Sequence, residues 1–467
     1  MSRFRLQAPL RAPAIAAALT AAGDVANATS GISTEFDPYY AGGWALSTST
    51  ANRTYSLPAK PAKATTIATA GLIDPISSAR VYRATDFANE GLVSPTRLRH
   101  EYAKRQAHNY DNTRYLEQDT GGFWYIFNAQ TFAKVSQTGS SGSVSGMAGD
   151  CEPFWHPTDP NKLWYTANNG GLIWYEYNLV SQTSSTLFTL AGKLPAGFTG
   201  ASRSWTKGEG RPSNDGRYWW LMVETDSFTH LGMVCYDRQA DSVIGHIVSS
   251  QRPDHCSISP LGNYCYSGYT SSPWATYYPP TYTGAVGGGT TLFNSVEHVD
   301  LAVGTDGTSE WIVYTDYSVS GYLIAKQMGG AGTSHQLVNL YPVGGEATAV
   351  HVSGLASIVQ PGWVLISTYG SYSDYGATSP APTCRWLYES AFWVRIGASP
   401  VPRVIANMHS RRYGADEGIT YFAEPQASPN RDGTRILFAS NWIGRAGTTD
   451  YVQPDDYLIG LPSWWAS

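Results

Sequence analysis

The sequence contains few charged side chains. Asp, Glu, Lys and Arg make up 14% of its 467 residues, whereas about 25% is usual in a soluble domain. This shortage disfavours a helical protein whose surface is covered by ion pairs. The formal net charge is -5, so the chain has no excess of Lys and Arg to neutralise phosphate groups. Nucleic acid is therefore excluded as the main ligand.

Long hydrophobic runs and cysteines are also scarce. No apolar run approaches the ~20 residues that a membrane-spanning helix needs, so we expect no membrane insertion. Five cysteines are too few for a disulfide-stapled scaffold, and an odd number leaves at least one unpaired. Cys256 and Cys265 flank an expected hairpin turn. They could pair or join His255 in a metal site, although buried free thiols are the commoner state.

Aromatic residues and glycine are abundant instead, with 31 Tyr, 16 Trp and 47 Gly. This mixture is typical of short strands that pack aromatic faces and are joined by tight turns. One unit, a polar turn followed by a strand that alternates apolar and polar residues, recurs seven times at spacings of roughly 45 to 70 residues. The units are NYDNTRYLE at Asn109, HPTDPNKLWYT at His156, PSNDGRYWWLMV at Pro212, SPLGNYCYSG at Ser259, GTDGTSEWIVYTD at Gly304, QPGWVLISTYG at Gln360 and SPNRDGTRILFAS at Ser428.

Seven such units predict an all-β fold, a seven-bladed β-propeller over residues 71–467 with four strands in each blade. Closing the blades into a ring removes long exposed sheet edges. A β-sandwich is the alternative, but sandwiches do not usually repeat one turn and strand at blade spacing. We expect Asn109, Asp215, Asp306 and Asp432 to lie in or beside equivalent hairpin turns.

Residues 1–70 differ from the rest of the chain. They are rich in Ala, Thr, Ser and Pro and lack strand-length alternation, so we expect a short non-globular N-terminal arm. The start, up to Ala28, has the outline of an export signal but is poor in Leu, Val and Phe. Because its small residues bury too little apolar area to offset the ordering entropy, we expect protein partners to hold the arm.

Polar residues just before the repeated turns are expected to meet at one mouth of the ring, because equivalent loops of a propeller point the same way. Nearly every blade offers a His or Arg at this position, and most of the ten histidines lie there. Any single one is more often structural than catalytic, but the set indicates a funnel that binds a ligand. The candidates for contact with substrate are His100, His108, His156, His298, His351 and Arg411.

Several segments together resemble the seven-bladed propeller polysaccharide lyases, the oligogalacturonate lyases and ulvan lyases. They are RHEYAKRQAHNYD, EPFWHPTDP, GEGRPSNDGRYW, DHCSISP, EHVD, HVSG and EPQASPNRDGTRILFASNW. The resemblance covers about Val81 to Pro462. It implies an acidic polysaccharide as partner and β-elimination at a uronic acid. In that reaction a base removes the C5 proton, a cation or metal stabilises the enolate, and an acid protonates the leaving oxygen.

The resemblance also implies roles for individual residues. By motif, His255 is the base, and Arg211 is the carboxylate clamp because a guanidinium offers two parallel donors. Tyr421 or His409 is the acid.

The resemblance leaves open whether the protein binds a divalent cation. The candidate ligands are His298, His351 and Glu424. The His-Pro-His-Pro metal-binding segment of oligogalacturonate lyases is replaced here by Glu424-Pro425-Gln426-Ala427. Both expected histidines are thus absent, although Glu424 still offers oxygen to a hard cation.

Two functions from different classes fit these features. The chain is a lyase-like propeller that acts on an acidic polysaccharide, or it is a non-catalytic receptor-binding or structural propeller of a large assembly. A phage tail or an extracellular appendage is an assembly of this kind, and the arm and the altered metal segment favour it. Either function predicts an extracellular or virion-associated protein.

Overall fold

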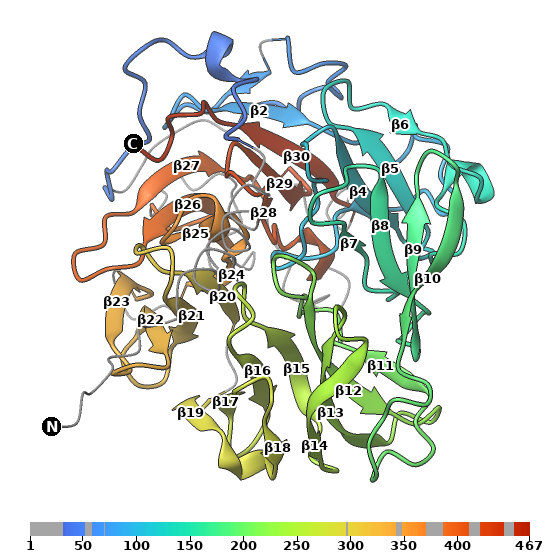
Figure 1. Ribbon diagram of the computed structural model, residues 1–467. Helices are drawn as coiled ribbons and strands as arrows, with labels where there is room; N and C mark the ends of the chain where they lie inside the picture. Colours follow the sequence, from blue (N-terminus) through green and yellow to red (C-terminus); the bar gives the residue numbers. More distant parts are fainter. Residues whose placement is uncertain are drawn as a thin grey trace, which may run out of the picture.

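The computed structural model describes residues 31–51, 58–69, 71–295, 298–341, 348–369, 386–410, 421–442 and 453–467. These residues form seven β-sheets arranged around a central axis (Figure 1). Their helices are single 3-10 turns, and none is long and apolar enough to cross a membrane. The seven-bladed propeller that the repeated units predict is therefore confirmed.

Blades 1 to 4 follow each other along the chain. Blade 1 contains β3 (Leu98–Arg99), β4 (Arg114–Asp119), β5 (Trp124–Asn128) and β6 (Lys134–Val135). Blade 2 contains β7 (Phe154–Trp155), β8 (Lys162–Thr166), β9 (Ile173–Asn178) and β10 (Thr183–Thr189). Blade 3 contains β11 (Arg203–Trp205), β12 (Tyr218–Glu224), β13 (His230–Asp237), β14 (Ser242–Val248) and, added in parallel, β18 (Thr283–Gly284). Blade 4 contains β15 (Pro253–Ile258), β16 (Cys265–Tyr269), β17 (Ala275–Tyr278) and β19 (Thr290–Phe293).

Blades 5 to 7 complete the ring. Blade 5 contains β20 (Val299–Val303), β21 (Glu310–Asp316), β22 (Tyr322–Met328) and β23 (Ser334–Asn339). Blade 6 contains β24 (Ala349–Ser353), β25 (Trp363–Tyr369), β26 (Ser390–Arg395) and β27 (Arg403–Asn407). Blade 7 contains β28 (Ser428–Pro429), β29 (Arg435–Ser440), β30 (Asp455–Gly460), β2 (Arg80–Arg83) and β1 (Leu72–Ile73). The 3-10 turns are η1 (Asp37–Tyr39), η2 (Ser140–Gly142), η3 (Val286–Gly288), η4 (Leu355–Ile358) and η6 (Tyr421–Ala423).

The expected turns join the first and second strands of their blades. The side chains of Asp215, Asp306 and Asp432 each accept a hydrogen bond from the backbone N–H two residues further on, at 3.0, 2.9 and 2.9 Å. The glycine after each aspartate has a φ of 70, 71 or 73°, a left-handed conformation that costs glycine little. Asn109 closes its own turn through a 2.9 Å bond from the Arg114 N–H. The four residues therefore lie in equivalent turns, as predicted, although Asn109 matches the position of Asn430, two residues before Asp432.

The hydrophobic core of the described residues is divided into seven clusters, and each lies between two neighbouring blades. Each blade is thus packed on both faces. In β12, for example, six of seven residues are buried, where the sequence predicts alternation of buried and exposed positions. The difference arises because alternation marks a sheet with one face in water, and these sheets have none.

Blade 7 joins the two ends of the propeller. The early strand β2 pairs antiparallel with the late strand β30, in a register that sets Arg80 opposite Gly460 and Arg83 opposite Tyr457. Figure 1 shows the blue β2 beside the red β30. This pairing closes the ring, which holds the inner strands around the central channel.

The described part of the N-terminal arm packs on this chain's own propeller. Phe36 is fully buried in the cluster between blades 7 and 1. Glu35 forms an ion pair with the buried Arg435, and the Tyr40 hydroxyl donates to the carbonyl of Gly460. Residues 31–51 and 58–69 thus have contacts within the chain, where we expected a partner to provide them. Contact with a second protein stays a prediction, and residues 1–30 lie outside the described part of the chain.

Candidate functional site

Three histidines from consecutive blades meet at one end of the central channel. His255 lies on β15 of blade 4, His298 directly precedes β20 of blade 5, and His351 lies on β24 of blade 6. The ring centroids of His298 and His351 are 4.8 Å apart. His298 also lies within electrostatic range of His255 and Glu209, which both influence its pKa. We call this group, together with Tyr102, Lys104, Glu209 and Glu424, the histidine mouth.

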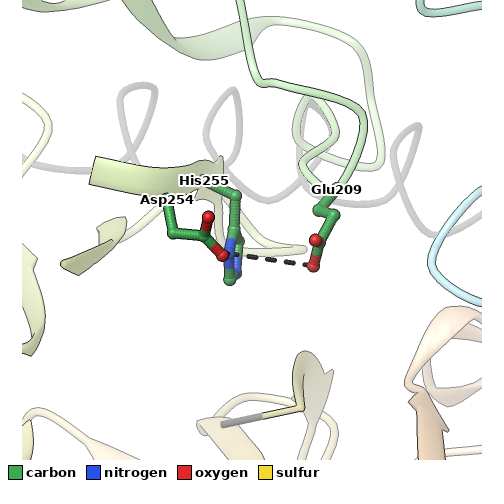
Figure 2. Close-up of side chains that lie close together, drawn as sticks. All are labelled: Glu209, Asp254 and His255. Carbon is green, nitrogen blue, oxygen red and sulfur yellow. Dashed lines mark ion pairs between the residues drawn. The ribbon is translucent and has the colours of Figure 1, made fainter. Parts of the chain in front are cut away.

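His255 is held between two carboxylates. Its Nδ1 lies 3.8 Å from Glu209 Oε2 and 3.7 Å from Asp254 Oδ2, distances too long for hydrogen bonds. Figure 2 shows Asp254 and His255 on one strand and Glu209 facing them from a loop. The side chain is 5% exposed, and within the described residues neither ring nitrogen has a hydrogen-bond partner. The imidazole is therefore oriented electrostatically while both nitrogens keep their bonding capacity.

Two lysines balance these carboxylates. Lys104 Nζ lies 2.6 Å from Glu209 Oε2, and Lys207 Nζ lies 2.8 Å from Asp254 Oδ1. Burial opposes ionisation of Glu209, but Lys104 and His255 outweigh it and lower its pKa to about 2. His255, followed by Lys207, lowers the pKa of Asp254 below its usual range. Both carboxylates are thus ionised at neutral pH.

His351 is fixed by several partners at once. Its Nε2 lies 2.7 Å from Glu424 Oε2, and its Nδ1 lies 3.3 Å from the hydroxyl of Tyr102. Its ring stacks on Tyr369, with centroids 4.9 Å apart. Burial raises the pKa of Tyr102 well above its usual value, so this phenol stays protonated and can donate to the imidazole.

His298 is neutral at physiological pH. Burial lowers its pKa to about 3, and the neighbouring His351 and Lys104 add to the shift. A neutral imidazole has one donor and one acceptor nitrogen. It can therefore bind a sugar hydroxyl through either nitrogen.

One compact set of ligand atoms in the described part of the chain could be considered for a metal. The ligand atoms of Glu209, Asp254 and His255 all lie within 4.8 Å of one another. Lys104 and Lys207 already neutralise the two carboxylates at salt-bridge distance. Their ammonium groups would repel a divalent cation bound a few ångströms away. A divalent cation would bind this set only after displacing the two ammonium groups.

The metal ligands expected from the sequence are arranged differently. Glu424 and His351 are bonded to each other, but with His298 they do not form a comparably compact set among the described residues. The amide oxygen of Gln426 accepts a hydrogen bond from Arg99. These residues do not fit a histidine-rich cation site, and we derive no reaction step through a metal.

The guanidinium of Arg211 is bonded to blade 5. Its Nη1 lies 3.1 Å from Asp300 Oδ2, and its Nη2 donates to the Leu301 carbonyl at 2.6 Å. Asp300 is two residues after His298, which corresponds to about 6 to 7 Å along a strand. The structure thus brings together His255, His298 and His351, while the guanidinium of Arg211 is held by blade 5.

Three of the other predicted histidines have structural surroundings. His100 bonds to Asp456 through Nδ1 and to the Gln426 carbonyl through Nε2, which ties blade 1 to blade 7. His108 is buried against Tyr115, and neither of its ring nitrogens has a partner among the described residues. His156 accepts two backbone hydrogen bonds within the turn between β7 and β8, at the far end of the channel.

The predicted acids lie on the segment between blades 6 and 7. Tyr421 begins η6 and is 40% exposed, and desolvation raises the pKa of its hydroxyl. His409 follows β27, and its ring packs on Trp442 with centroids 4.5 Å apart. Arg411 lies outside the described residues.

Sequence reasoning missed two residues of the mouth and a tyrosine that packs on it. Tyr102 and Lys104 lie in the segment before the first turn, between Arg99 and His108, in which only His100 and His108 were predicted as site residues. Tyr369 ends β25 and stacks on His351. A tyrosine and a lysine within a histidine-bearing segment were a usable signal for the first two. No sequence signal distinguishes Tyr369 from the other aromatic residues.

The comparisons with known proteins agree at the level of the fold. An oligogalacturonate lyase from Vibrio parahaemolyticus superposes with a TM-score of 0.54 at 11% sequence identity, over 84% of this chain and 96% of that chain. An oligogalacturonate lyase in complex with manganese gives a TM-score of 0.53 at 14% identity, with the same coverage of both chains. No protein-family model matches the sequence, and no curated protein matches it significantly. The chain therefore has the seven-bladed propeller architecture that these lyases also have.

Proposed function

We propose that the histidine mouth binds a uronate unit of an acidic polysaccharide and that the chain cleaves the polymer by β-elimination. One observation carries the proposal: three histidines from consecutive blades lie together where the inner strands begin, and among the described residues His255 has both ring nitrogens unbonded between two carboxylates. The architecture shared with the two oligogalacturonate lyases is consistent with this function.

His255 is the base in this proposal. It accepts the C5 proton of the uronate, the C4–C5 double bond forms, and the glycosidic C4–O4 bond breaks. The imidazolium that results is stabilised by Asp254 and Glu209, whose Oδ2 and Oε2 lie 3.7 and 3.8 Å from its Nδ1. A carboxylate that stabilises an imidazolium in this way is a recurrent arrangement in enzymes that use a histidine base.

The substrate carboxylate needs a positive charge as electrons flow toward it. Arg211, the residue expected from the sequence, is bonded to Asp300, two residues beyond His298 on blade 5. Lys104 is bonded to Glu209, the carboxylate that faces His255, and its ammonium group has three donors, of which Glu209 uses one. We therefore assign Lys104 as the principal cation and Arg211 as a supporting charge.

The leaving oxygen must receive a proton. Tyr421 suits this role because it is 40% exposed, lies within electrostatic range of Glu424 and Glu209, and has a raised pKa that keeps the hydroxyl protonated. His409 packs on Trp442, which makes it the weaker candidate. The proton from Tyr421 and the one taken by His255 balance the elimination.

The reaction is tested by incubating the protein with polygalacturonate, alginate and ulvan. Elimination creates an unsaturated uronate, so ultraviolet absorbance should rise with at least one of these polymers and not with a neutral polysaccharide. Binding without any rise in absorbance would contradict the lyase and favour a non-catalytic receptor-binding propeller. An extracellular or virion-associated location, with the arm contacting a protein partner, is part of the proposal in either case.

A further inference from the structure

A cavity in the central channel extends from Lys104 of the histidine mouth to the first turns of several blades. Its wall includes residues of four first turns, namely Pro157, Ser213, Pro260 and Arg431 of blades 2, 3, 4 and 7. The histidine mouth, in contrast, lies where the inner strands begin. The cavity has a volume of ≈ 70 Å³, and a buried water needs roughly 10 to 15 Å³ on the same measure. It therefore has room for about five water molecules, the size of a small polyatomic group.

The cavity wall contains three cationic side chains and no carboxylate: Lys104, Arg211 and Arg431. Lys104 is paired with Glu209 at 2.6 Å and Arg211 with Asp300 at 3.1 Å. Arg431 has no acidic partner among the described residues. The cavity thus carries one positive charge more than its surroundings neutralise.

Arg431 is well placed to bind a ligand there. It is 9% exposed, and it reaches from the turn between β28 and β29 to the Pro157 carbonyl, to which Nη1 donates at 3.0 Å. Its guanidinium also lies 5.6 Å from the Tyr110 ring centroid. A guanidinium has five N–H donors in a planar fork, and one of them is used by Pro157. Burial lowers the pKa of Arg431 to about 10, so it is still charged at neutral pH.

A buried cation without a counterion is costly unless something neutralises it. Neighbouring groups of the wall suit an anion: Asn214 and Gln106 provide amide donors, and Trp155 and Trp164 provide apolar surface. A planar guanidinium fork matches the geometry of carboxylate and phosphate oxygens. We propose that this cavity is a binding site for a compact oxyanion, a carboxylate, sulfate or phosphate group, held by Arg431. The site shares Lys104 with the histidine mouth but is centred on Arg431, which lies outside the mouth. The proposal does not rest on the lyase activity.

The test uses the full chain and three probes, sodium acetate, sodium sulfate and sodium phosphate, each compared with sodium chloride at equal ionic strength. Thermal melting and isothermal titration calorimetry should show stabilisation and binding with at least one oxyanion beyond the chloride effect. The anion that binds most tightly identifies the chemical group. No oxyanion effect beyond that of chloride would overturn the proposal.

Two variants show whether Arg431 is responsible. R431M should abolish the oxyanion effect and, because the uncompensated charge is gone, should melt at the same or a higher temperature than the wild type without added anion. R431K keeps the charge but loses the fork, so binding should weaken by about tenfold or more. A matched control, R203M, removes an arginine that pairs with the exposed Asp226 and should leave the oxyanion effect intact.

Either of two results with these variants would count against the site. Wild-type anion binding by R431M would place the anion elsewhere. A melting temperature of R431M below that of the wild type, with the oxyanion effect retained in R431K at full strength, would show that Arg431 serves only to tie blade 7 to blade 2 through Pro157. If R431M does not fold, the anion titration of R431K alone tests the proposal. Oxyanion binding by R431K as tight as that of the wild type would show that the planar guanidinium of Arg431 does not bind the anion.

Discussion

Two groups of histidines in this propeller occupy similar positions in the sequence and very different surroundings. At the seam between blades 7 and 1, both ring nitrogens of His100 are bonded, to Asp456 and to the Gln426 carbonyl. At the mouth, neither ring nitrogen of His255 is bonded among the described residues. A position before a turn thus brings a histidine to the channel. Its hydrogen-bond partners then decide whether the imidazole stabilises the fold or keeps free nitrogens that can react with a ligand.

The largest expected effect is on turnover. Replacing His255 by Ala should reduce turnover of the responsive polymer by at least about 100-fold, as expected for loss of a general base, with substrate affinity changed little. The absorbance assay measures turnover, and calorimetry measures affinity. H335A is the control, because His335 stacks on Trp311 in blade 5 and should leave both unchanged. Full turnover in H255A would remove the distinction between the two groups.

A substitution at the seam between blades 7 and 1 should lower the stability of the fold. Replacing His100 by Ala leaves the buried Asp456 and the Gln426 carbonyl without their imidazole partner, so the free energy of unfolding should fall by about 2 to 4 kcal/mol. Urea denaturation measures this loss. Turnover per folded molecule should stay close to that of the wild type. A variant that is as stable as the wild type but inactive would move His100 from the seam group to the mouth group.

A third histidine, His108, should make the stability of the fold depend on pH. Burial, assisted by the nearby His100, lowers the pKa of His108 to about 3. Below pH ~6.5 the unfolded imidazole binds a proton and the folded one does not until about pH 3. Stability is therefore lost as the pH falls through this window, by at most about 1.4 kcal/mol per pH unit for this group.

The substitution His108→Leu removes the imidazole that binds a proton in the unfolded state, and with it this contribution to the pH dependence of stability. The slope of unfolding free energy against pH, measured by urea denaturation between pH 7 and 5, should be shallower in the variant than in the wild type. The remaining slope reports other groups, including His298, whose pKa burial lowers in the same direction. Equal slopes in the two proteins would mean that His108 is charged or solvated in the folded state.

The smallest expected effect is that of a chelator. Because Lys104 and Lys207 already neutralise Glu209 and Asp254, treatment with EDTA should not change turnover. Loss of turnover on chelation, restored by Mn²⁺ addition, would show that a cation enters the mouth despite the lysines.

The fold could be predicted because its signal is local and repeated. Asp215, Asp306 and Asp432 each make their turn through a bond to a residue two positions away, and such turns are visible in a single sequence. The identity of the mouth was partly accessible for the same reason, since His255, His298 and His351 stand at repeated positions.

The roles of individual side chains were less accessible, because they depend on partners far away in the chain. Asp456 lies 356 residues from His100, and nothing near His100 in the sequence indicates that bond. Arg211 precedes its turn as the histidines do, yet its long side chain reaches across blade 4 to Asp300. The depth at which a side chain ends in the channel follows from the packing of neighbouring blades, which a repeat pattern does not encode.

Because β2 pairs with β30, it must wait during translation until nearly the whole chain has been synthesised. Arg83 on β2 and its ion-pair partner Asp455 on β30 are 372 residues apart. At 5 to 20 residues per second, a ribosome needs roughly 20 to 75 s to travel between them. Throughout that interval β2 has left the ribosome without its partner strand and presents an unpaired edge to other nascent chains. The period of vulnerability to aggregation is thus governed by the rate of elongation, however fast any single blade folds.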